Sequence, residues 1–378
     1  MNCFFFDKNR SLWRKSVIFV RMKKVNPIYI RRVLLASLFV GVLAFRYIPD
    51  AGEAYARDVY PVVSFCLSAI AAIFPFSLCE IVVIVGSLFL ILFPFYAKRK
   101  AKRSWKHIAF IEVEVILWVY VWFYWGWGMN YFRENIFERS QVSHARYDES
   151  RFKTFLVSYA DSLNAAYCVP TDRDKNCRAL ESSIKNIYRA VPSVFGLSEA
   201  FGYQHPKLSL INGLYSKVGV LGYIGPFFCE SHVNREVLPL QYPFTYAHEL
   251  SHLLGVSEEA EANFWAYQTC IRSGNRFVRY SGYFGLLPYV YTNARATLSS
   301  EDFETWRASV RPEVLLALRE KEEYWDERYS RLMGTVQNVL YEWYLKGNRI
   351  SSGQKNYGEV IGIILSMPQG WWNYAERR

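Results

Sequence analysis

The chain has few charged residues for its length. Only 21% of its 378 residues are charged, whereas 52% are hydrophobic and 18% are aromatic. Such a composition excludes an intrinsically disordered or collagen-like protein. The mean hydropathy is nevertheless close to zero, at −0.01, which is too polar for a protein made only of membrane spans. The composition therefore predicts a membrane part joined to a soluble part.

Cysteine pairs and repeats are also missing. None of the seven cysteines forms a Cys-x-x-Cys pair, and the chain has no internal repeat or low-complexity run. Cys168 and Cys177 are close enough in sequence to form a disulfide in an oxidising compartment, but ordinary buried thiols explain them at least as well. The cysteines therefore support no functional argument.

The net charge of +11 is concentrated in two stretches. Residues 1–32 carry nine Lys/Arg against one acid, and residues 97–107 carry six against none, so the rest of the chain nets −3. Both stretches adjoin long apolar segments, where basic residues mark the cytoplasmic side of a membrane. We attribute the charge to membrane topology and expect no nucleic-acid binding.

Four apolar segments lie within residues 1–129, which we predict to form the membrane region. Three are expected to span the bilayer and one, residues 59–74, to lie in the outer interface; the three spans are about 28–48, 80–96 and 108–128. Between residues 59 and 97 the only charge is Glu80. Two crossings there would leave three residues for the turn and would move the second basic stretch to the outer side.

This topology places residues 130–378 outside the cytoplasmic membrane, as in a multi-pass protein of a bacterial inner membrane. The alternative for the first segment is a signal peptide cleaved after Ala54-Tyr55-Ala56. Cleavage would leave the soluble part on the same side. Met22 is an alternative start that would make the first 21 residues dispensable.

The soluble part is predicted to be mainly α, of the α+β class. Apolar residues recur every three or four positions in 149–167 and 174–190, which predicts two helices. Residues 206–228 mix apolar residues with glycines and indicate short strands and turns. Helices are expected from Tyr242 almost to the end. The longest is expected after Pro312, with a core stripe made of Leu332, Val336, Val339, Leu340 and Trp343.

The most informative motif is His248-Glu249-x-x-His252. Two histidines four positions apart on a helix are separated by roughly 40°, so they can share one metal ion. Glu249 lies about 100° from His248, where it can reach a metal-bound water without ligating the metal. The flanks are apolar, and Gly255 is suited to end the helix. A pair of satisfied core histidines is the alternative.

A catalytic zinc takes three protein ligands and a water, so one ligand is still needed. Ser257 is a suitable N-cap for a second helix that starts with acidic residues. The helix dipole explains Glu258 and Glu259, whereas Glu261 is one turn further in and is followed by apolar residues. We predict Glu261 as the third ligand, with Glu258 as the alternative.

This arrangement resembles the glutamate-zincin metallopeptidases. The whole chain further resembles a family of uncharacterised bacterial inner-membrane proteins with three N-terminal spans, suspected to be zinc peptidases. The matching segments are Trp125-Gly126-Trp127-Gly128-Met129-Asn130-Tyr131, Pro243-Phe244-Thr245, Glu261-Ala262-Asn263-Phe264, Tyr344-Leu345-Lys346-Gly347-Asn348 and Lys355-Asn356-Tyr357-Gly358. The resemblance implies a zincin-like fold, a Zn²⁺ site at His248, His252 and Glu261, and a catalytic role for Glu249. It implies no substrate.

We therefore predict a membrane-anchored zinc peptidase that acts on a protein or peptide of the cell envelope. Residues 218–228 could bind an extended substrate by main-chain pairing, or could be scaffold. Tyr280, Tyr283 and His232 are candidates to stabilise the oxyanion. One alternative is a non-catalytic envelope protein with a structural metal or histidine site. Another is a transporter, whose only ionisable groups near membrane depth would be Glu80, Glu112 and Glu114.

Overall fold

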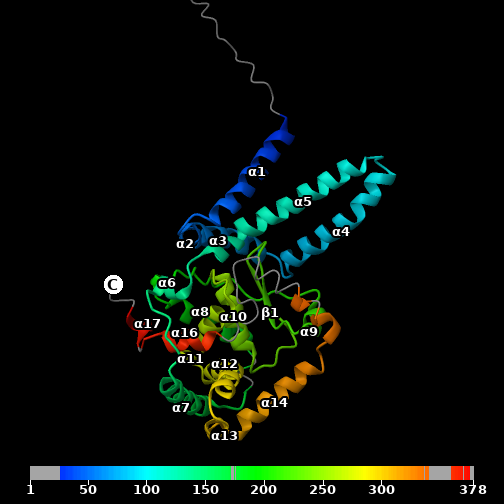
Figure 1. Ribbon diagram of the computed structural model, residues 1–378. Coiled ribbons are helices and arrows are strands. Elements are labelled where there is room, and N and C mark those ends of the chain that lie inside the picture. The colour runs from blue at the N-terminus through cyan, green and yellow to red at the C-terminus, as the bar shows by residue number, and fades with distance from the viewer. Residues whose placement is uncertain are drawn as a thin grey trace, which may run out of the picture.

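The computed structural model describes residues 26–171, 174, 176–335, 337–339, 359–368 and 370–374. The chain is mostly helical, and three of its helices are long and apolar enough to span a membrane (Figure 1). They are α1 (Pro27–Phe45), α4 (Leu78–Arg99) and α5 (Trp105–Gly126). The prediction of three candidate spans is confirmed, with ends that differ from the predicted ones by up to three residues.

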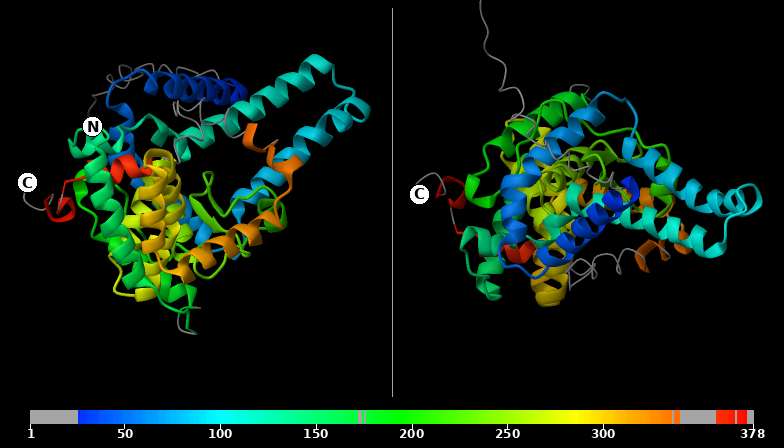
Figure 2. Two further views of the ribbon diagram at one scale, coloured as in Figure 1. Left: turned by 60° about the horizontal axis from the view of Figure 1, so that its bottom comes forward. Right: turned by 90° about the horizontal axis from the view of Figure 1, so that it is seen from above.

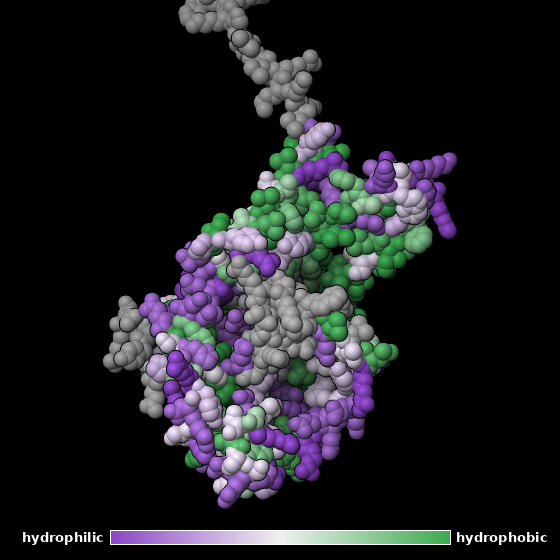
Figure 3. All heavy atoms as spheres, in the orientation of Figure 1, coloured by the Kyte–Doolittle hydropathy of each residue, from purple (hydrophilic) through white to green (hydrophobic). Residues whose placement is uncertain are grey.

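The three long helices leave the soluble part together. Helices α4 and α5 form a hairpin whose turn, with its basic residues, lies far from the soluble part, and α1 runs along α5 (Figures 1 and 2). Side-chain oxygens of Ser77 and Ser104 cap the starts of α4 and α5. Hydrophobic side chains cover this hairpin on the face seen in Figure 3. Arg31 of α1 forms an ion pair with Glu114 of α5 at 2.7 Å. Glu114, one of the three acids expected near membrane depth, thus has a structural partner.

Short helices connect the long ones to the soluble part. They are α2 (Ala51–Ala54), η1 (Tyr55–Val59), α3 (Tyr60–Ala72) and η2 (Gly128–Phe132). One face of α3 is buried through Tyr60, Ser64 and Ser68, whereas Val62 and Ile70 on its other faces are exposed. Helix α3 overlaps the predicted interfacial helix. The Tyr60 hydroxyl donates to the carbonyl of Leu253 at 2.8 Å, so α3 is tied to the soluble part.

The soluble part is built from helices around α10 (Tyr242–Leu253), α11 (Glu259–Ile271) and α12 (Arg276–Thr297). Around them lie α6 (Ile136–Ser140), α7 (Glu149–Ala166), α8 (Cys177–Arg189), η4 (Ser193–Phe195), α9 (Asn212–Lys217), α13 (Ser300–Ser309), α14 (Pro312–Asp326), α16 (Val360–Ser366) and α17 (Trp371–Tyr374). Among the described residues, one sheet is found, an antiparallel pair of β1 (Gly222–Gly225) and β2 (Glu230–Val233). The mainly α prediction is confirmed, and in the part of the chain that the structure describes the β component is this hairpin with two isolated β-bridges.

Several sequence predictions for the soluble part need correction. Helices α7 and α8 match the two predicted helices, but the region predicted as strands, 206–228, holds helix α9 and only one strand. The helix after Pro312 has 15 residues, fewer than the 22 of α12. In the predicted core stripe, Leu332 is 79% exposed and Val339 is 49% exposed. Its other members lie outside the described residues, as do the late segments used for the family resemblance. Cys168 and Cys177 are both free thiols.

Candidate metal centre

Helix α10 carries the His-Glu-x-x-His motif in the middle of the soluble part. It packs against α11, α12 and both strands, so Glu249 and His252 are buried. The helix ends at Leu253, and Gly255 follows with φ +96°, a conformation that favours glycine. The indole of Trp127 donates to the carbonyl of His252 at 2.9 Å, and Arg133 donates to that of Gly255 at 2.9 Å. Segments next to the long helices thus hold the end of α10 in place.

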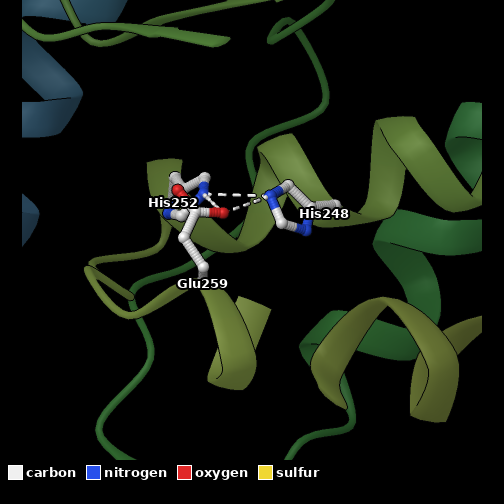
Figure 4. A group of neighbouring side chains, drawn as sticks. All are labelled: His248, His252 and Glu259. Atoms are coloured by element: carbon white, nitrogen blue, oxygen red, sulfur yellow. Dashed lines mark hydrogen bonds and ion pairs between the residues drawn. The ribbon is translucent and has the colours of Figure 1, made fainter. Parts of the chain in front are cut away.

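The two histidines of the motif and Glu259 converge on one point (Figure 4). The Nε2 atoms of His248 and His252 are 3.2 Å apart. Glu259 Oε2 lies 3.1 Å from the first of these nitrogens and 3.7 Å from the second. Ligand atoms around a tetrahedral zinc with bonds of about 2.0–2.1 Å are roughly 3.3 Å apart. The three side chains therefore fit a metal ion of this size.

Both imidazoles have a partner that fixes their orientation. The Nδ1 atom of His252 lies 2.8 Å from the main-chain carbonyl of Val256, which can only accept a hydrogen bond. Nδ1 of His248 lies 3.0 Å from the Asn263 side-chain oxygen. With both Nδ1 atoms as donors, each Nε2 can offer a lone pair toward the shared point, as in metal-binding histidines.

The third residue at this point is Glu259, not the predicted Glu261. The Glu261 side chain is buried on the opposite side of α11, where it pairs with the guanidinium of Arg139. The indole of Trp265 donates to its other carboxylate oxygen at 2.8 Å. Glu258, the alternative, is the N-cap of α11 and does not belong to the cluster.

The phase of helix α11 explains this correction. Residues two apart on a helix point roughly 200° away from each other, so Glu259 and Glu261 cannot face the same point. Helix α11 starts at Glu259, whereas Ser257 bonds the carbonyl of Asn130 instead of capping the helix. Asn263 is the residue that could have indicated Glu259 in the sequence. It lies four residues after Glu259 and therefore on the same face of the helix, and its side chain reaches His248.

The cluster lies in a cavity of about 790 Å³. The cavity is lined by Trp127, Tyr131, Tyr215, Val218, Gly219, Val220, Leu221, Gly222, Tyr223, Ile224, Pro226, Phe244, Thr245, His248, Glu249, His252, Ser257, Glu259, Asn263, Tyr289, Gln337 and Asn338. Strand β1 forms one wall and passes directly over Glu249. A Cβ atom on Gly222 would lie 2.6 Å from Glu249 Oε1, so any larger residue there would force the Glu249 side chain to move.

Burial and mutual charge set the protonation of the site. Burial raises the pKa of Glu249 to about 7, against an opposing effect of the two histidines. Burial lowers the pKa of His252, but the charge of Glu259 and its hydrogen bond outweigh this and raise it to about 9. Burial also raises the pKa of Glu259, but His252 and His248 outweigh it and hold that pKa well below its usual value. Glu259 is thus ionised at neutral pH and stabilises a positive charge on His252.

None of the three predicted oxyanion candidates lines the cavity. Tyr280 packs against Tyr167, Tyr283 packs against Tyr159, and His232 is buried under the ring of Tyr223. The structure instead brings Tyr289 of α12 to the cavity. Burial raises the pKa of Tyr289, and the charge of the nearby Glu259 carboxylate raises it further. Sequence reasoning missed it because nothing distinguishes it among 28 tyrosines.

The structure therefore defines a mostly helical chain with three candidate spans and a buried His/Glu cluster in a cavity. The chain belongs to the family described as Protein of unknown function (DUF3810), which matches residues 55–365. No curated protein and no solved structure matches it.

Proposed function

We propose that the protein is a membrane-anchored, zinc-dependent peptidase whose soluble part, residues 130–378, cleaves a protein or peptide of the cell envelope. The observation that carries the proposal is the convergence of His248, His252 and Glu259 beside Glu249 in one cavity. Within the described residues three candidate ligands are found, and the cavity leaves room for a water molecule. A structural zinc is normally enclosed by four protein ligands, so this arrangement favours the catalytic proposal over a structural site.

The chain's own residues supply the rest of the chemistry. Zinc bound by the three ligands would lower the pKa of a water molecule and polarise a substrate carbonyl. Glu249 is the proposed general base: its carboxylate is buried beside the ligands, and its Oε2 atom has no hydrogen-bond partner. Tyr289 is the proposed hydrogen-bond donor to the oxyanion, because its phenol reaches the same cavity.

Strand β1 is the proposed docking site for an extended substrate. The main-chain amide of Asn234 donates to the carbonyl of Leu221 at 2.8 Å. In an antiparallel ladder every second residue directs its main-chain N–H and C=O groups to the partner strand, so Leu221, Tyr223 and Gly225 direct theirs toward β2. The main-chain groups of Gly222 and Ile224 then point to the other side, and no hydrogen bond joins them to another described residue. A peptide added as a strand here would pass over Glu249.

Metal content is the direct test. Full-length protein in detergent, dialysed against buffer without chelator, is expected to hold about one zinc per chain by elemental analysis. Glu259→Ala should release most of this zinc, whereas the matched variant Glu258→Ala should retain it. A folded protein with less than a tenth of the expected metal would contradict the proposal.

We also propose that the soluble part is extracytoplasmic in a bacterial inner membrane. The basic residues of 97–107 lie at the α4–α5 turn, far from the soluble part, and the positive-inside rule places such residues in the cytoplasm (Figure 1). Alkaline phosphatase fused after Arg378 is therefore expected to be active. An inactive phosphatase together with a fluorescent cytoplasmic reporter at the same point would show the opposite orientation.

A further inference from the structure

Strand β1 connects the proposed site to the start of a candidate span. At one end Gly222 contacts Glu249, and at the other end Gly225 is so close to α4 that an added Cβ would lie 2.8 Å from Cys79 Cβ. Three residue steps of roughly 3.3 Å separate these ends, a distance of about 10 Å. The turn after β1 packs on α5, with the ring of Phe228 5.3 Å from that of Trp122. The cavity thus lies next to the ends of the long helices.

An exposed apolar surface lies next to the start of α4 at this junction. It consists of Ile73 (76% exposed), Phe74 (37%), Phe76 (37%), Leu208 (54%), Leu210 (58%), Ile211 (37%) and Leu214 (43%). The hydropathy view shows hydrophobic residues over the long helices (Figure 3). Apolar side chains gathered on one face of a soluble domain mark an interaction surface.

Specific bonds fix this apolar surface at the level where α4 begins. Phe76 pairs with Leu208 through main-chain bonding. The amide of Leu210 donates to Glu80 Oε2 at 2.7 Å, and the hydroxyl of Ser209 donates to Glu80 Oε1 at 2.7 Å. Glu80 belongs to the first turn of α4, and exposed apolar residues continue along that helix from Val83. The apolar surface is thus continuous with the apolar exterior of the candidate span.

We propose that the apolar surface inserts into the leaflet on the side of the soluble part, so that the cavity opens at the bilayer surface. Tyr215 lines the cavity, and the preceding residue, Leu214, belongs to the apolar surface. Helix α9 therefore lies between the proposed lipid contact and the cavity. If the proposed peptidase function holds, its substrates are polypeptides tethered to the membrane by a lipid or a span. Tethering raises the local substrate concentration at such a site.

The membrane contact can be tested without any activity. Single cysteines placed at Leu210 or Leu214, in full-length protein with Cys3, Cys66, Cys168 and Cys177 replaced by serine, are labelled with bimane in nanodiscs that each hold one copy. Lipids brominated in their acyl chains are expected to quench both labels, as they quench a label at Ile91 within α4. A label at Val157, which is 61% exposed on α7, serves as the control that is not quenched. Labels at 210 and 214 that behave like the Val157 control would overturn the proposal and leave a protein partner as the occupant.

The substrate class is tested with one peptide library in two forms. Peptides carrying a palmitoyl chain on phosphatidylcholine–phosphatidylglycerol vesicles are expected to be cleaved at least about tenfold faster than the same peptides free in solution. Equal rates would overturn the tethered-substrate inference while supporting the peptidase. Cleavage of neither form by zinc-loaded protein would overturn the peptidase function and the substrate class together, and the quenching result would still decide the membrane contact.

Discussion

Replacing Glu249 by glutamine is expected to lower kcat by about 10²–10⁴-fold while zinc content and melting temperature stay nearly unchanged. Loss of a general base costs a factor of this size. The amide has the shape of the carboxylate, so it preserves the close contact with Gly222. The measurements are turnover of the cleaved library peptides, elemental analysis and thermal melting of the full-length protein.

The matched comparison is His248→Ala, which removes a proposed ligand and should release the metal. If Glu249→Gln and His248→Ala destabilise the protein equally and neither alters a measurable turnover, the motif has a structural role. Retention of full activity by Glu249→Gln would assign the proton transfer to another group.

Replacing Arg139 by methionine is expected to reduce the free energy of unfolding by about 3–5 kcal/mol, because it leaves the Glu261 carboxylate buried without its cation. The guanidinium is fully buried, and it also donates to the carbonyl of Phe195 at 2.6 Å. Chemical denaturation in detergent, followed by tryptophan fluorescence, measures the loss. The folded fraction should still bind zinc.

The double variant Arg139→Met/Glu261→Gln should recover much of that stability, since no charge is left unpaired in the interior. This outcome would identify the pair as structural. If Glu261→Gln alone releases the zinc while Glu259→Gln retains it, the assignment of the third ligand made from the structure is wrong.

Short-range patterns were sufficient to predict the candidate spans, helices α7 and α8 and the end of α10. Each depends on hydrophobic periodicity, on a long apolar run or on a glycine such as Gly255 that adopts a positive φ. The motif itself follows from helical geometry, and the structure places His248 and His252 together as that geometry requires.

The misassigned residues depended on information from distant parts of the chain. Glu261 was preferred because apolar residues follow it, but its burial is explained by Arg139, which is 122 positions earlier in the sequence. An error of one or two residues in the predicted start of α11 changes which acidic residue is expected to face the histidines. Helix ends are the least certain part of a sequence-based prediction. Tyr289 reaches the cavity only through the packing of α12 on α10 and α11.

The spacing of the proposed ligands has a consequence for folding. All three fall between residues 248 and 259, on two consecutive helices joined by a short loop. The loop-closure entropy for bringing them together is therefore small, and contacts of such low sequence separation form early. We infer that the α10–α11 hairpin can form, and could bind the proposed metal, before the distant Arg139 and the helices near the membrane have docked around it.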